Sequence, residues 1–480
     1  MTAPTQPPAS SESAPEAPAE SAPGAPAPAA GARVTRTFAT ASGPVVGVVD
    51  GEVVRVLGVP YAVAGRFEPP RPAPPELDAD GRPVPFEAFR RAPASPQLAD
   101  EALSSVIEGA SVGMVDSEHC QALSLTVPAD LAPGEHLPVM VWIHGGSYVT
   151  GAGDLAVYDP RELVAEQRVV VVTVTYRLGM LGFLGDGVEV PANLGLLDQL
   201  AAVRWVHENV AAFGGDPDLV TLFGQSAGGD AIAHLMISDG ARGLFRRAIV
   251  QSAPLGITTG RSRMTRAMVE AVGTPSRDAP VSEVLALQSV AERAAKGHGL
   301  RSGMAFGPQY GHAPLPPERE RDAAWREVAP EIDLLIGSTT EETGLFLAFV
   351  PGLRRLAELP VVGRAVRRLL VGTTTHAVYG RDARAFADRH RASGGRAVRY
   401  ELTWAPEGSA FGAAHVTDVP LLLGGRAAWG HTLLVGDSDW ADVDRRGRRL
   451  RQVWADFART GTVAADAGAG LGDTIRLFRG

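Results

Sequence analysis

The segment from Val220 to Gly229 joins an apolar, β-branched run to a glycine-rich turn and a stretch of small residues that suits a helix start. Ser226 stands in the turn between Gly224 and Gly228. At a sharp strand-to-helix turn the serine backbone is strained and its hydroxyl projects clear of the sheet, so side chains at the flanking positions would clash. The chain has 55 glycines, so the pentapeptide can arise by chance, and the surrounding sequence decides its meaning.

Segments typical of strands alternate with segments typical of helices over most of the chain. The β-branched runs Leu137–Ile143 and Val169–Tyr176 are typical of strands buried on both faces of a sheet. A β-hairpin is indicated by Val45–Val49 and Val53–Leu57 around an Asp-Gly turn. This alternation predicts an α/β fold with a mostly parallel central sheet and helices on both faces. Further strands are expected before Ser226 and at Arg247–Gln251, Ile332–Ile336 and Ala397–Trp404, and helices at Leu196–Phe213, Val281–Ala295 and Arg449–Arg459.

The N-terminal segment, residues 1–32, differs in composition from the rest of the chain. It is almost wholly Ala, Pro, Ser, Gly, Thr and Glu, and it cannot bury enough apolar surface to offset the entropy lost on ordering. We therefore expect residues 1–32 to be a disordered tail. They lack the apolar stretch of a secretory signal, and no run in the chain approaches the length of a membrane span. Residues 33–480 are expected to form one domain, with residues 256–330 as a lid or inserted region.

Charge and cysteine content argue against several roles. The net charge of −9 comes without a basic stripe, which argues against nucleic acid as a partner. The arginine-rich stretch Arg445–Arg451 is the exception, and we interpret it as a solvated face beside the last helix. Cys120 is the one cysteine of the chain, so an intrachain disulfide is impossible and a reducing compartment, the cytoplasm, is expected.

The hydroxyl of Ser226 needs a neighbouring base before it can act as a nucleophile. That base is nearly always a histidine, which a buried carboxylate orients. His415 is the candidate because it lies in a loop of small residues after the strand expected at Ala397–Trp404, and catalytic side chains cluster in such loops. Glu341 and Glu342 follow the preceding expected strand. Adjacent side chains point in different directions, so only one of these two glutamates can orient His415.

A glycine-rich loop is expected beside the serine. His144, Gly145, Gly146 and Ser147 follow the strand Leu137–Ile143. Backbone N–H groups in such a loop can stabilise a developing negative charge on oxygen, and the N–H of the residue after a nucleophile completes the arrangement. A Gly-Gly turn alone is only a turn. Paired with the Ser226 turn further along the chain, it indicates an oxyanion hole.

These strings together resemble the type-B carboxylesterase family, the cholinesterase-like branch of the α/β-hydrolases, from about residue 38 to about residue 462. The resemblance implies an α/β-hydrolase catalytic domain with a triad of Ser226, His415 and Glu342. It also implies an oxyanion hole formed by Gly145, Gly146 and Ser147 with Ala227, and two structural ion pairs, Arg177 with Asp198 and Arg66 with Glu118. The motifs that carry the resemblance are Gly58-Val-Pro-Tyr-Ala, Ser117-Glu-His-Cys, Trp142-Ile-His-Gly-Gly, Tyr176-Arg-Leu-Gly, Asn193-Leu-Gly-Leu-Leu-Asp-Gln, Phe213-Gly-Gly-Asp-Pro, Phe223-Gly-Gln-Ser-Ala-Gly-Gly and Trp454-Ala-Asp-Phe-Ala-Arg-Thr-Gly.

The chain departs from the family pattern at several places. Ser95 stands where the family often has the cysteine that would bridge to Cys120. Ser147 replaces the usual Gly or Ala of the oxyanion loop, and its hydroxymethyl group narrows the space for bulky acyl or tertiary alkoxy groups. The segment between Gln251 and Gly337 is shorter than is usual in the family, which implies a shortened helical lid and a more open or reshaped pocket.

The expected function is hydrolysis of small-molecule carboxylic esters through an acyl-enzyme on Ser226, with no metal or organic cofactor. One alternative keeps the fold and changes the task to cyclisation, elimination or acyl transfer on a specialised metabolite. The altered motifs and the short lid motivate this alternative. A further alternative is a non-catalytic binding protein, but relatives of that kind usually lose the serine or the histidine, and this chain retains every triad candidate.

Overall fold

The computed structural model describes residue 1 and residues 33–99, 105–107, 113–350, 352, 355, 359, 363–464 and 471–479. The predicted tail lies outside the described residues apart from residue 1. Thr35–Gly480 form one unit, and the interpretation of residues 256–330 as a lid stays a prediction.

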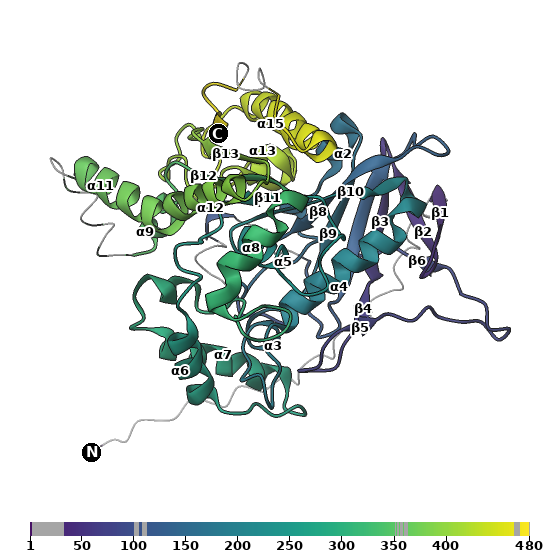
Figure 1. Ribbon diagram of the computed structural model, residues 1–480, viewed down its shortest axis with the longest axis horizontal. Coiled ribbons are helices and arrows are strands. Elements are labelled where there is room, and N and C mark those ends of the chain that lie inside the picture. Colours follow the sequence, from purple (N-terminus) through teal and green to yellow (C-terminus); the bar gives the residue numbers. More distant parts are fainter. Residues whose placement is uncertain are drawn as a thin grey trace. The chain divides into compact units, whose positions relative to one another are not determined.

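A large mixed sheet runs through the centre of this unit (Figure 1). Its middle strands, from β9 through β8, β10, β11 and β12 to β13, are all parallel, whereas the strands at both ends are antiparallel. The predicted α/β class is therefore confirmed. The strands of this path in spatial order are β1 (Thr35–Thr40), β2 (Gly43–Asp50), β3 (Val53–Pro60), β7 (Ala122–Pro128), β9 (Val170–Val174), β8 (Leu137–Ile143), β10 (Gly215–Gln225), β11 (Arg247–Gln251), β12 (Asp333–Thr339), β13 (Ala397–Leu402) and β14 (Ile475–Arg479).

The predicted hairpin is present as β2 and β3, with Asp50 paired to Val53 across the turn. One short strand, β6 (Phe86–Glu87), pairs with β2 beside the main path. The strands β4 (Ala62–Val63) and β5 (Arg71–Pro72) form a separate two-stranded sheet. In the described parts of the chain, no helix combines the length and apolar character that crossing a membrane requires.

Helices cover both faces of the sheet because its middle strands are apolar on both sides. Along β10, Leu222 belongs to one hydrophobic core and its neighbour Phe223 to the other. The first core contains side chains from α4 and α5, and the second contains side chains from α2 and α15. The helices are α2 (Arg161–Gln167), α3 (Gly179–Gly182), α4 (Leu194–Asn209), α5 (Ala227–Leu235), α6 (Ser262–Val272), α7 (Val281–Ala295), α8 (Arg321–Val328), α9 (Gly344–Ala348), α11 (Gly363–Thr375), α12 (Arg381–Ala392), α13 (Val419–Leu422), α14 (Arg426–Trp429) and α15 (Trp440–Thr460).

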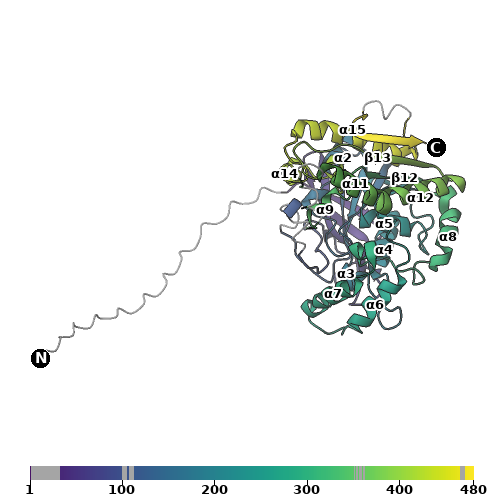
Figure 2. The same cartoon turned by 90° about the vertical axis from the view of Figure 1, so that its left-hand side faces the viewer.

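The helix α15 and the helix pair α6 and α7 lie at opposite ends of the unit formed by Thr35–Gly480. Figure 2 shows α15 at the top and the pair α6 and α7 at the bottom, beneath α3. The helix predicted at Val281–Ala295 has the same bounds as α7. The helix predicted at Leu196–Phe213 ends earlier, as α4, and its last residues form a 3₁₀ turn, Val210–Phe213.

The last helix corrects the interpretation of Arg445–Arg451. This stretch lies inside α15, which begins well before the predicted start, and Arg451 is only 1% exposed. Its guanidinium contacts Glu166 at 2.7 Å, Asp444 at 3.1 Å and Glu162 at 3.2 Å. Gly447, one turn earlier, makes room for it, because a Cβ there would lie 2.7 Å from the Arg451 Nη1 atom. The prediction of a solvated face is therefore wrong for Arg451. Two of its three carboxylate partners, Glu162 and Glu166, lie on α2, which is distant from α15 in the sequence.

Candidate active site

Ser226 lies at the turn where β10 enters α5. Its backbone has φ 60° and ψ −124°, a strained conformation for a residue with a side chain. A Cβ at Gly224 would lie 2.5 Å from the Ile143 carbonyl oxygen, and one at Gly228 would lie 1.9 Å from that same oxygen. Both flanking positions therefore need glycine, because the turn packs directly against the end of β8.

The His415 imidazole faces Glu342. Its Nδ1 atom lies 2.5 Å from the Glu342 Oε2 atom, and both side chains are buried. The other carboxylate oxygen of Glu342 accepts a hydrogen bond from the Thr339 backbone N–H at 2.7 Å. Glu341 points elsewhere, is partly exposed and pairs with Arg367 at 3.1 Å. Of the two glutamates, the structure thus brings Glu342 to the histidine, and the catalytic role of the pair stays a prediction.

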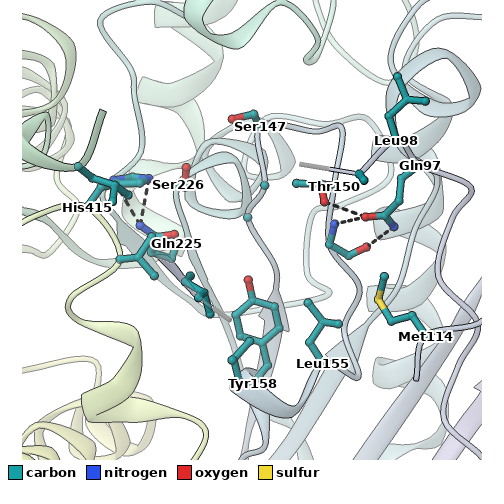
Figure 3. A pocket seen from close by; sticks show the side chains of 18 of the residues that line it. Gln97, Leu98, Met114, Ser147, Thr150, Leu155, Tyr158, Gln225, Ser226 and His415 are labelled. Atoms are coloured by element: carbon teal, nitrogen blue, oxygen red, sulfur yellow. Dashed lines mark hydrogen bonds between the residues drawn. The ribbon is translucent and has the colours of Figure 1, made fainter. Parts of the chain in front are cut away.

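Ser226 and His415 line the same pocket (Figure 3). Among the described residues, no hydrogen bond joins the Ser226 hydroxyl to the imidazole. Instead the amide nitrogen of Gln225 lies 3.2 Å from the His415 Nε2 atom. Catalytic hydrogen bonds are often loose in unliganded enzymes and tighten when substrate binds. Gln225 fills the variable position before the serine in the Gly-X-Ser-X-Gly turn, and nothing in the sequence marked it as a functional residue.

The glycine loop after β8 lies beside Ser226, because a Cβ at Gly145 would be 3.1 Å from the Ser226 Cβ atom. Gly145, Gly146 and Ser147 line the pocket together with Ser226. Gly146 has φ 109°, and a Cβ there would lie 2.1 Å from the Thr150 carbonyl oxygen. Within the described structure, the backbone N–H groups of Gly146 and Ser147 donate to no other residue. Free N–H groups beside a nucleophile are what an oxyanion hole requires.

Gln97 holds the far end of this loop. Its side-chain oxygen accepts hydrogen bonds from the Gly151 backbone N–H and the Thr150 hydroxyl, both at 2.8 Å. Its side-chain nitrogen donates to the Gly151 carbonyl at 3.1 Å (Figure 3). Gln97 is a second residue that the sequence analysis missed, because it lies far before Thr150 in the chain and belongs to no recognisable motif.

The pocket has a volume of about 410 Å³ and a mainly apolar lining. Figure 3 shows Ser226 and His415 on one side of it, with Leu98 and Met114 on the other. Among the described lining residues, no lysine or arginine is present, and the one carboxylate is that of Asp116. Burial raises the pKa of Asp116 above its usual value. Other apolar and aromatic side chains in the lining are those of Ile107, Leu155, Val157, Tyr158, Leu345, Phe346, Phe349, Val416 and Trp429.

Both ion pairs implied by the family resemblance are present. The buried Arg177 guanidinium contacts Asp198 at 2.7 Å, and Arg66 contacts Glu118 at 2.5 Å. Neither pair lines the pocket that contains Ser226. Cys120 is a buried free thiol, and burial raises its pKa, so its reactive thiolate form is disfavoured.

A serine at a strained strand-to-helix turn on a largely parallel sheet, with a glycine loop beside it, is the arrangement of the α/β-hydrolase class. The profile of the Carboxylesterase family matches residues 34–358. The chain belongs to this family and is a hydrolase of carboxylesterase type.

Similar proteins extend this likeness beyond the matched residues. A probable N-octanoylanthranilate hydrolase of Rhodococcus erythropolis is 35% identical over 427 residues, covering 88% of this chain and 92% of that protein. The para-nitrobenzyl esterase of Bacillus subtilis (strain 168) is 32% identical over 461 residues, covering 89% of this chain and 90% of that protein. A solved PNB esterase structure matches with a TM-score of 0.73 and 28% identity, covering 90% of this chain and 92% of that one.

Proposed function

We propose that this protein hydrolyses carboxylic esters through an acyl-enzyme on Ser226. The supporting observation is that one pocket contains a serine at a strained turn, a histidine held by a buried glutamate, and a loop with free N–H groups. The proposal assigns His415 as general base and Glu342 as the carboxylate that orients it.

In the first half-reaction the Ser226 hydroxyl oxygen attacks the ester carbonyl carbon while its proton passes to His415 Nε2. The carbonyl electron pair moves onto oxygen, and the N–H groups of Gly146, Ser147 and Ala227 stabilise that oxyanion. Glu342 stabilises the imidazolium because its carboxylate accepts the hydrogen bond from Nδ1. When the tetrahedral intermediate collapses, His415 donates its proton to the departing alkoxide, and the alcohol leaves.

In the second half-reaction water repeats the sequence on the acyl-enzyme. His415 takes a proton from water, the resulting hydroxide oxygen bonds to the acyl carbon, and the Ser226 oxygen leaves with the proton that His415 returns. The Gln225 amide nitrogen lies against the same imidazole, 3.2 Å from Nε2 and 3.4 Å from Nδ1.

The pocket supports a neutral substrate with an apolar acyl group. Its lining is rich in aliphatic and aromatic side chains, which favour a hydrocarbon chain. The relative from Rhodococcus erythropolis is named for a substrate with an octanoyl group on anthranilate. An octanoyl chain suits the lining found here. The carboxylate of anthranilate would have no lysine or arginine to pair with among the described lining residues. We therefore propose that the alcohol part of the substrate is uncharged.

Turnover of p-nitrophenyl esters from acetate to octanoate tests this proposal. We expect kcat/KM to rise with acyl length. A p-nitrophenyl octanoate with a carboxylate on its ring should be a poorer substrate than p-nitrophenyl octanoate itself.

The nucleophile assignment is tested on the same esters. Ser226→Ala should lower kcat by about 10⁴-fold or more on every ester. A Ser226→Ala variant that keeps more than about a tenth of the wild-type rate would refute the nucleophile assignment.

A further inference from the structure

Asp230 is a fully buried carboxylate that the proposed mechanism does not use. It lies on α5, one helical turn after Ser226, and its backbone N–H donates to the Ser226 carbonyl at 2.9 Å. Its Oδ2 atom accepts a hydrogen bond from the Tyr148 hydroxyl at 2.6 Å, and Tyr148 is also fully buried. A buried carboxylate needs such a partner to offset its lost hydration.

Tyr148 belongs to the oxyanion loop and directly follows Ser147. Both residues have left-handed backbones, with φ 54° at Ser147 and φ 63° at Tyr148. This conformation is unfavourable for residues that carry a Cβ, and it persists only where surrounding contacts hold it. The Ser147 N–H group is oriented in part by the Ser147 φ angle, and Tyr148 is the next residue that anchors this backbone.

Three contacts hold Tyr148 in place. Its ring packs against Phe183 with a centroid distance of 4.4 Å, and its carbonyl accepts a hydrogen bond from Gly179 at 2.7 Å. The third contact is the hydrogen bond to Asp230. Of the hydrogen bonds between described residues, this is the one that joins the loop of residues 144–151 to α5.

Two basic side chains, those of His234 and Arg261, lie near the Asp230 carboxylate. Its Oδ1 atom lies 3.5 Å from the His234 Nδ1 atom. The buried Arg261 guanidinium is also close enough to interact: burial lowers the pKa of Arg261, and the negative charge of Asp230 partly offsets this effect. Arg261 in turn donates to the Ala305 carbonyl at 2.5 Å.

We infer that Tyr148 and Asp230 form a positioning pair that fixes the two halves of the oxyanion hole against each other. The inference rests on the proposed function. Ala227 is the first residue of α5, whereas Gly146 and Ser147 belong to the loop, so the N–H groups come from two separate segments. The Tyr148–Asp230 hydrogen bond links these segments beside the reacting carbonyl. Neither side chain touches the substrate in this account.

Tyr148→Phe tests the pair because it removes the hydroxyl and keeps the ring. We expect kcat on p-nitrophenyl octanoate to fall about 10-fold, with KM within about 2-fold of wild type, because a misplaced oxyanion donor destabilises the transition state more than the bound ester. Affinity for a trifluoromethyl ketone inhibitor, whose adduct mimics the tetrahedral intermediate, should fall by a similar factor. Tyr61→Phe is the matched control: its buried hydroxyl donates to the Thr175 carbonyl at 2.8 Å, away from the oxyanion loop, so kcat should stay near wild type.

Asp230 variants complete the test. Asp230→Asn keeps an acceptor for the tyrosine and should retain more of the wild-type kcat than Asp230→Ala. Asp230→Ala combined with Tyr148→Phe should lower kcat by less than the product of the two single-variant factors, because both changes remove the same Tyr148–Asp230 hydrogen bond. Additive losses, or a Tyr148→Phe variant whose kcat matches that of Tyr61→Phe, would overturn the inference. Fluorophosphonate labelling of wild-type Ser226 tests the proposed function separately. The proposed function requires that this labelling occurs, whereas the positioning pair is tested only by the kinetics of the variants.

Discussion

At the scale of single residues, Glu341 and Glu342 show how position in the fold decides chemistry. They are chemically identical and adjacent, yet Glu342 is fully buried against His415 and Glu341 pairs with Arg367 near the surface. The local sequence left both open as partners of the histidine, and only the family resemblance pointed to Glu342. The direction in which the chain leaves β12 turns one side chain inward and the other outward.

This pair offers a matched test of the carboxylate assignment. Glu342→Gln should lower kcat by about 10³-fold or more, because a neutral amide neither stabilises the imidazolium nor fixes the required tautomer. Glu341→Gln should change kcat by less than about 3-fold, since it removes only a partly exposed ion pair. Steady-state kinetics on one p-nitrophenyl ester compares the two. Equal losses in both variants would contradict the assignment of Glu342.

Asp418 provides a prediction about pH. Burial raises the pKa of its carboxyl to about 6; the Gln251 hydrogen bond lowers it, the Glu342 charge raises it further and His415 lowers it. A raised carboxyl pKa means that the folded state holds the proton more tightly than the unfolded state does. The associated stability is therefore present below about pH 4 and is lost as the pH rises through about 6.

Asp418→Asn should remove this loss, because the amide stays neutral and its oxygen can still accept from Gln251. We expect the variant to be more stable than wild type by about 3 kcal/mol at pH 8 and nearly equal to it at pH 4. Thermal unfolding at the two pH values measures the difference. If Asp418→Asn raised the unfolding temperature by the same amount at pH 4 and at pH 8, the ionised Asp418 carboxylate would not be the cause of the stability difference.

At the scale of elements, the turn between β10 and α5 was the most predictable part of the molecule. Its apolar strand, flanking glycines and small helix residues are contiguous, so local sequence carried the whole signal. The longer final helix was less predictable. Its N-terminal half is rich in charged residues, which hides the apolar periodicity of a helix. The carboxylates that pair with Arg451, those of Glu162 and Glu166, lie much earlier in the chain, on α2.

Gly228→Ala tests the packing of that turn. The added methyl group would meet two backbone carbonyl oxygens, at 1.9 Å from Ile143 and 2.8 Å from His144, and neither can move without disturbing β8. We expect a loss of about 3 kcal/mol or more in the free energy of unfolding. Gly372→Ala in α11 is the control: its new methyl group meets nothing within 4 Å, so the variant should gain about 0.5 kcal/mol. Denaturant unfolding of both variants gives the comparison, and a wild-type stability for Gly228→Ala would refute this packing argument.

At the scale of the whole molecule, strand positions were predictable but much of their spatial order was not. The runs Leu137–Ile143 and Arg247–Gln251 form strands with the predicted bounds, because buried β-branched segments have few alternatives. The order β7, β9, β8, β10 requires crossovers that no local pattern specifies. For the same reason the sequence did not reveal Gln225 at His415, Gln97 at the glycine loop or the Tyr148–Asp230 pair. The contacts of Gln97 and of the Tyr148–Asp230 pair join segments far apart in the chain, and no sequence motif marks either partner as half of a pair. Gln225 does lie in a motif, but at its variable position.

The proposed mechanism requires a covalent acyl intermediate on Ser226. Rapid acid quenching during turnover of p-nitrophenyl octanoate, followed by mass spectrometry of the intact protein and its peptides, detects this intermediate. We expect one octanoyl group on the peptide that contains Ser226, and none on the Ser226→Ala variant. An active enzyme that carries the acyl group on another residue, or that carries none while its turnover resists Ser226→Ala, would contradict it.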